Sequence, residues 1–112
     1  VDTVRVDMGE PILEAERIPT TLPGPRVIDV PLPLAGDFGG MAGIELLGTC
    51  VSMGNPHVTI YVRDVSKVPL EKIGPVLETL SVFPRRINVH FVQVVSPAEV
   101  IMRTWERGSG IT

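Results

Sequence analysis

The sequence predicts an α+β fold whose mixed sheet is rich in antiparallel strands. We count about six short segments with the alternation or apolar character of strands, and one segment with helical periodicity. Strand and helix candidates do not alternate strictly, which disfavours a doubly wound parallel sheet and leaves α+β or a mostly β fold. The length of 112 residues suits one domain with a modest core.

The first half of the chain contains four predicted strands separated by irregular connectors. These strands are expected at residues 4–8, 27–30, 44–53 and 57–63. Pro31 and Pro33 are expected to end the second strand, because proline cannot donate to a strand ladder. Residues 12–25 contain three prolines and a glycine and predict an irregular connector, whereas the four glycines of residues 36–43 predict a turn.

The second half contains the single helix candidate and a predicted hairpin. Apolar residues recur at three- and four-residue steps over residues 69–80, which indicates a short helix that we expect to be peripheral. Gly74-Pro75 interrupts this pattern, so the segment is either one kinked helix or a short turn followed by a helix. Residues 86–95 and 99–107 predict two strands of an antiparallel hairpin, joined at residues 96–98.

Composition disfavours several classes of function. The formal net charge of −3 and the 4% aromatic content, without a Lys/Arg cluster, argue against a nucleic-acid partner. No apolar run approaches the ~20 residues of a membrane span. The single cysteine, Cys50, precludes an internal disulfide and suits the reducing cytoplasm. It lies in an apolar segment without a neighbouring base, so we expect a buried structural thiol.

The run Gly54-Asn55-Pro56-His57 is the first candidate for a binding site. Gly54 permits a sharp approach and Pro56 biases Asn55 toward an extended backbone, so the run predicts a stiff corner that presents an amide and an imidazole. Asn55 can donate to a carboxylate and accept from an ammonium. His57 titrates near neutrality. The alternative is an ordinary turn followed by an exposed histidine.

Asn88 is the second candidate, because asparagine is depleted in strands and this one lies among apolar residues. It either caps a bulge or faces a polar cavity. His90 shares its face by alternation. It has no evident partner, and we expect it at the surface or as a satisfied core residue.

Glu106 and Arg107 form the third candidate, at the end of the last predicted strand. Adjacent strand residues point to opposite faces unless a turn re-aims one, and the glycines that follow favour such a turn. Glu106 would then accept from an ammonium while Arg107 binds a carboxylate. The alternative is a solvated surface pair. Taken together, the three candidates predict a pocket for a small ligand that carries both a carboxylate and an ammonium group.

Four ordered motifs resemble those of the diaminopimelate epimerase family. They are VSMGNPH at 51–57, VPLEKIGP at 68–75, RINV at 86–89 and WERGSG at 105–110, and residues 6–11 resemble the family's linker into its second domain. The resemblance implies a sheet rolled around a central helix. It also implies that residues 1–112 are the first part of the C-terminal domain of a two-domain homodimeric enzyme. The N-terminal domain and the central helix of this domain would then lie outside the chain.

The resemblance also implies an activity and roles for the candidate residues. The family interconverts LL- and meso-diaminopimelate for lysine and peptidoglycan synthesis, without pyridoxal phosphate, any other cofactor or a metal. One cysteine removes the α-proton and a second returns a proton to the opposite face. Asn55 and Asn88 match substrate-binding asparagines, and Glu106 and Arg107 match the pair that binds the distal amino-acid end. His57 and Glu106 match the residues that tune the two thiols.

Neither catalytic cysteine is expected within these residues, and Cys50 matches neither. The chain alone is therefore expected to be inactive and poorly packed. Two alternatives remain open. One is another isomerase on the same fold, resembling proline racemase or a phenazine-biosynthesis enzyme. The other is a non-catalytic, β-rich binding module.

Overall fold

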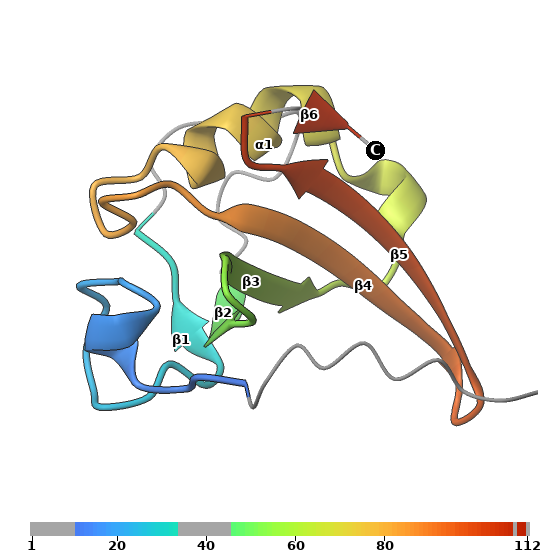
Figure 1. Ribbon diagram of the computed structural model, residues 1–112. Helices are drawn as coiled ribbons and strands as arrows, with labels where there is room; N and C mark the ends of the chain where they lie inside the picture. Colours follow the sequence, from blue (N-terminus) through green and yellow to red (C-terminus); the bar gives the residue numbers. More distant parts are fainter. Residues whose placement is uncertain (1–10, 34–45, 109, 112) are drawn as a thin grey trace, which may run out of the picture.

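A computed structural model describes residues 11–33, 46–108 and 110–111, which form one mixed six-stranded sheet in sequential order (Figure 1). The strands are β1 (Val30–Pro31), β2 (Leu47–Ser52), β3 (Pro56–Tyr61), β4 (Asn88–Ser96), β5 (Glu99–Glu106) and β6 (Gly110–Ile111). Only β3 and β4 pair in parallel, which confirms the antiparallel-rich α+β prediction. The strand expected at 4–8 and the turn expected at 36–43 lie outside the described residues.

The strand expected at residues 27–30 is shorter and later than predicted. Asp29 has a positive φ of 48°, which interrupts the extended backbone, and only Val30 and Pro31 pair with β2. β1 ends at Pro31, as predicted, and Pro31 is itself still aligned with Leu47 of β2. β1 lies at the edge of the sheet, where proline is tolerated because the missing N–H need not face a neighbour.

A 3-10 turn, η2 (Val65–Lys67), and the helix α1 (Leu70–Glu78) connect the parallel strands β3 and β4. The helix runs through Pro75 as one element. Its apolar stripe of Leu70, Ile73 and Leu77 is buried in the main core, so the expectation of a peripheral helix was wrong. Burying each of these side chains contributes about 1.5–3 kcal/mol, so α1 is a principal source of core stability.

Gly74 allows α1 to approach β5 closely. A Cβ atom at this position would overlap the indole ring of Trp105. The glycine that interrupts the helical pattern of the sequence therefore sets the distance between helix and sheet. Of the helices that the structure describes, none combines the length and apolar character needed to cross a membrane.

The two faces of the sheet differ sharply in burial. On the helix-facing side, Ile60 and Phe91 are opposite one another in the register and are fully buried. On the other side, Tyr61, Val92 and Met102 align across three strands, and Tyr61 and Met102 are 61% and 57% exposed. The long β4–β5 hairpin also projects beyond α1 (Figure 1). The second face therefore carries unburied apolar side chains.

Candidate functional site

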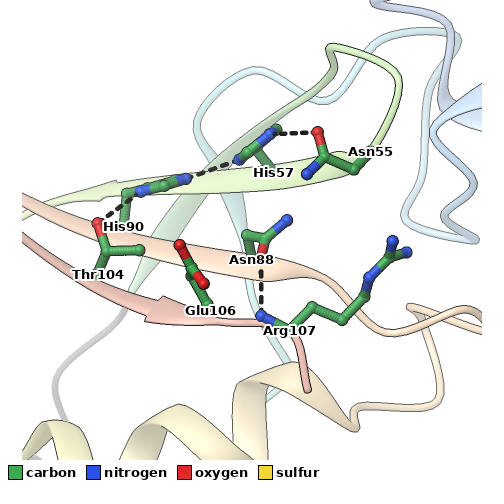
Figure 2. Close-up of a pocket in the computed structure, with 7 residues that line it drawn as sticks. All are labelled: Asn55, His57, Asn88, His90, Thr104, Glu106 and Arg107. Carbon is green, nitrogen blue, oxygen red and sulfur yellow. Dashed lines mark hydrogen bonds between the residues drawn. The ribbon is translucent and has the colours of Figure 1, made fainter. Parts of the chain in front are cut away.

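A hollow of about 220 Å³ lies on the less covered face of the sheet, around the beginnings of β3 and β4 and the end of β5. It is lined by Asn55, His57, Asn88, His90, Thr104, Glu106 and Arg107 (Figure 2). The five residues singled out from the sequence thus share one cavity. They come from three segments widely separated in the chain.

The turn before β3 positions Asn55 beside His57. Gly54 adopts a φ of 94°, and the Met53 N–H donates to the Asn55 carbonyl at 3.0 Å, which closes the corner. The side-chain Oδ1 of Asn55 lies 2.9 Å from Nε2 of His57. The predicted stiff corner is present, and its amide and imidazole interact with each other.

Asn88 connects the start of β3 to the turn after β5 by two hydrogen bonds at the base of the hollow. Its side chain is 5% exposed, and Nδ2 donates to the Pro56 carbonyl at 3.0 Å. Its Oδ1 accepts the Arg107 N–H at 2.7 Å. One amide hydrogen and one lone pair remain for a ligand. Of the two interpretations, the polar cavity is confirmed, whereas the register irregularity of β4 lies at Val94/Ser96 and not at Asn88.

Glu106 ends β5, and Arg107 lies in the turn that follows. The predicted re-aiming of one side chain is confirmed, because Gly108 has a φ of 80° and both residues line the hollow. Figure 2 shows the Arg107 side chain extending away from the Glu106 carboxylate. The Arg107 Nη1 donates to the Arg85 carbonyl at 3.4 Å. The pair thus offers an acceptor and a cation at separate points of one cavity.

His90 is half-buried and has two partners that the sequence did not indicate, so it resembles the expected satisfied residue more than a surface one. Its Nε2 lies 2.8 Å from Nδ1 of His57, and its Nδ1 lies 2.9 Å from Oγ1 of Thr104. The two rings stack with centroids 5.0 Å apart. The partners are distant in sequence, and only the parallel register of β3 and β4 brings the rings together.

Glu78 is a second residue that sequence reasoning missed. Its carboxylate is nearly buried at the end of α1, where it accepts from Trp105 Nε1 at 2.8 Å and from the Gly108 N–H at 3.1 Å. Arg86 pairs with it at 3.6 Å. Glu78 therefore fixes the turn that carries Arg107. A buried carboxylate flanked by apolar helix positions was the available signal.

The electrostatic environment keeps both histidines neutral at neutral pH. Burial lowers the pKa of His57 below its usual value of 6.5, and the charge of Arg107 lowers it further. Burial also lowers the pKa of His90, with a smaller effect from His57. The hollow therefore contains two imidazoles that accept hydrogen bonds as well as donate them.

Cys50 lies on the other face of the sheet, opposite the buried Val58. Burial raises the pKa of its thiol to about 12, so the expectation of a structural thiol is confirmed. Within residues 11–33, 46–108 and 110–111, no three His, Cys, Asp or Glu side chains gather in a way that could hold a metal ion.

The family profile and the individual relatives that match this chain carry the same name. Residues 49–112 match the profile described as diaminopimelate epimerase. The chain is 49% identical over 112 residues to "Diaminopimelate epimerase" of Pelotomaculum thermopropionicum, covering all of this chain and 38% of that protein. It is 51% identical over 109 residues to the protein of the same name from Picosynechococcus, covering 97% of this chain and 37% of that protein. The chain thus spans little more than a third of its curated relatives.

Proposed function

Because the chain belongs to the diaminopimelate epimerase family, we propose that it is the first part of the C-terminal domain of an enzyme that interconverts LL- and meso-diaminopimelate. The relatives carry that name, and the chain covers 38% of the Pelotomaculum protein. The remaining length accommodates an N-terminal domain and the end of the C-terminal one. The whole enzyme is a homodimer in this proposal.

The observation that carries the proposal is the shared hollow. Asn55, Asn88 and Arg107 come from three motifs that could have ended at unrelated turns, yet they line one cavity with Glu106. A ligand with both carboxylate and ammonium groups matches this set of donors and acceptors. Arg107 binds the distal carboxylate and Glu106 accepts from the distal ammonium. The asparagine amides contact the same molecule.

The chemistry in this proposal uses two thiols from outside the 112 residues. One thiolate removes the α-proton and the other thiol delivers a proton to the opposite face, so the centre inverts without a cofactor. His57 and Glu106 set the proton affinities of these thiols. Oriented N–H groups in a water-poor cavity stabilise the developing carbanion. The residues described here therefore bind and orient the substrate and adjust the acid–base pair.

A central helix completes the domain in this proposal. The apolar side chains exposed on the second face of the sheet, including Tyr61 and Met102, support a further element that covers them. That element would follow the second cysteine. The 112 residues alone are inactive because both thiols are supplied from elsewhere.

Solvent exchange of the α-proton tests the function. The full-length protein is incubated in heavy water with diaminopimelate, and with proline in a parallel reaction. We expect deuterium in diaminopimelate and none in proline. Exchange into proline alone would favour the racemase-like alternative, and exchange into neither would favour a binding module.

Arg107→Lys and Arg107→Met test the role of the distal clamp. Losing one partner of a charged hydrogen-bonded pair costs roughly 2–5 kcal/mol, so kcat/KM for diaminopimelate falls by about thirtyfold or more in Arg107→Met. Lys retains the charge and loses the bidentate geometry, which gives an intermediate value. Arg63 provides a matched control as Arg63→Met, because it follows β3 at its end remote from the hollow. Equal effects at both positions would refute the clamp.

A further inference from the structure

We propose that His90 is a positioning residue which, with Thr104, holds His57 as the neutral tautomer that carries its proton on Nε2. Four polar groups form one line in the hollow, running from Asn55 through His57 and His90 to Thr104 (Figure 2). The tautomer follows from the contacts alone. Its consequence for catalysis rests on the proposed function.

The direction of the line follows from what each atom can donate. The Asn55 Oδ1 only accepts, so Nε2 of His57 carries a hydrogen and donates to it over 2.9 Å. In the neutral ring Nδ1 of His57 is then an acceptor, and Nε2 of His90 donates to it over 2.8 Å. The Nδ1 of His90 accepts in turn from the Thr104 hydroxyl over 2.9 Å. Each contact is satisfied in this one arrangement.

The sheet holds the two rings at this distance. His57 is opposite Asn88 in the parallel register and Thr59 is opposite His90, so the histidines are diagonal neighbours on one face. Thr104 is directly opposite His90 on the antiparallel side. Each ring is half-buried, and their stacking limits rotation. Backbone pairing on both sides of β4 thus fixes the line before any ligand binds.

The contact also limits the pair to one charge. Two doubly protonated rings would direct two N–H groups at each other across 2.8 Å. A single added proton reverses the direction of the hydrogen bonds along the line. His57 then carries hydrogen on both nitrogens and donates from Nδ1 to Nε2 of His90. His90 carries its hydrogen on Nδ1 and donates to the Thr104 hydroxyl, which becomes an acceptor. The charged side chains that line the same hollow are Glu106 and Arg107, and β2 contributes the apolar Val51 opposite His57. Burial and Arg107 lower the pKa of His57, which favours the neutral arrangement.

The consequence is a His57 whose donor points to the Asn55 corner and whose acceptor is occupied by His90. A free imidazole exchanges tautomers, whereas this ring presents one. If His57 adjusts a catalytic thiol, it does so through Nε2, which can exchange its exposed partner Asn55 for the thiol, because His90 occupies Nδ1. His90 itself acts through His57 and needs no contact with substrate.

Nitrogen NMR of the imidazoles tests the proposal without substrate. In full-length, ¹⁵N-labelled protein at about pH 8, where free imidazole is neutral, we expect both rings to carry hydrogen on Nε2, with signals assigned by His57→Gln and His90→Gln. His90→Leu removes the donor to Nδ1 of His57. The exposed Asn55 amide can then turn either its oxygen or its NH2 group to the ring, so we expect a tautomer mixture at His57. His90→Gln restores an N–H donor and the single tautomer. On acidification, both rings report the same first apparent pKa.

Activity provides the second readout. We expect kcat to fall about two- to tenfold in His90→Leu, the effect of one net hydrogen bond, with KM unchanged and the acid limb of the pH profile shifted. His90→Gln recovers most of kcat. Should His90→Leu fail to fold, Thr104→Val removes the hydroxyl donor and is expected to mix the tautomers of His90.

Two results would overturn the proposal. One is a His57 that carries hydrogen on Nδ1 in the unmodified protein. The other is an unchanged tautomer of His57 in His90→Leu or of His90 in Thr104→Val. A protein with the expected tautomers and no exchange into diaminopimelate would instead refute the proposed function alone.

Discussion

The side chain of Asn88 holds the backbone of Arg107, accepting its N–H at 2.7 Å from a position that is 5% exposed. The same amide donates to the Pro56 carbonyl at the start of β3. One buried residue thus connects the turn that carries the distal clamp to the strand that carries His57. The geometry of the hollow and the stability of the sheet therefore depend on the same two hydrogen bonds.

Asn88→Ala is expected to lower the free energy of unfolding by about 2–4 kcal/mol, because two backbone groups lose partners in a buried site. Urea denaturation of the full-length protein measures this. Asn55→Ala is the control, since Asn55 is exposed in a turn, and its change is expected to stay within about 0.5 kcal/mol. Equal changes in the two variants would contradict the structural role of Asn88.

Glu78→Ala is expected to raise KM for diaminopimelate more than it lowers kcat. The change leaves Trp105 Nε1 and the Gly108 N–H without their acceptor, so the turn that carries Arg107 is no longer held. We also expect a loss of about 1–3 kcal/mol in unfolding free energy. Steady-state kinetics and denaturation check both effects. Glu71→Ala, from the exposed side of the same helix, should change neither.

Stability is expected to fall as the pH drops below 6.5, the usual pKa of histidine. His57 and His90 have lowered pKa values in the folded state, so the unfolded chain binds more protons in this range. The loss of stability continues until the pH falls through the pKa values of the two histidines in the folded state. Above pH 6.5 the two histidines make stability no more dependent on pH. Denaturation midpoints of the unmodified protein and the His57→Gln/His90→Gln variant measure the difference. The same pH dependence of stability in the unmodified protein and in the variant would contradict the contribution of the two histidines.

Cys50 is expected to resist alkylation by iodoacetamide in the folded protein, because burial raises the pKa of its thiol to about 12. Peptide mass spectrometry after alkylation, with and without urea, measures the protection. Cys50→Ala should retain full activity and lose only the packing of one small side chain. Rapid modification under native conditions would show that the thiol is accessible.

The 112 residues expressed alone are expected to bind a hydrophobic dye strongly and to unfold with low cooperativity. One face of the sheet leaves Tyr61, Val100 and Met102 exposed, so apolar surface remains in water. The full-length protein is the control and should bind little dye. A sharp cooperative transition of the short chain, with low dye binding, would contradict this expectation.

The sequence by itself determined the elements that depend on local patterns. The alternation of apolar and polar residues predicted β3, and the three- and four-residue spacing of apolar residues predicted α1. The short Ser96-Pro97-Ala98 connection predicted the β4–β5 hairpin. Local backbone chemistry also located the corners, since Gly54 and Gly108 adopt the positive φ angles that the turns require. The four motifs by themselves indicated the family.

Only the tertiary structure decided which side chains meet. The pairing of His57 with His90 depends on the register of two parallel strands that are separated by a helix, and no local pattern encodes that register. The burial of α1 likewise arises from contacts with residues of other segments. The attachment of Glu78 to the Gly108 turn joins residues that are thirty positions apart. Periodicity indicates which face of an element is apolar, whereas packing determines what that face contacts.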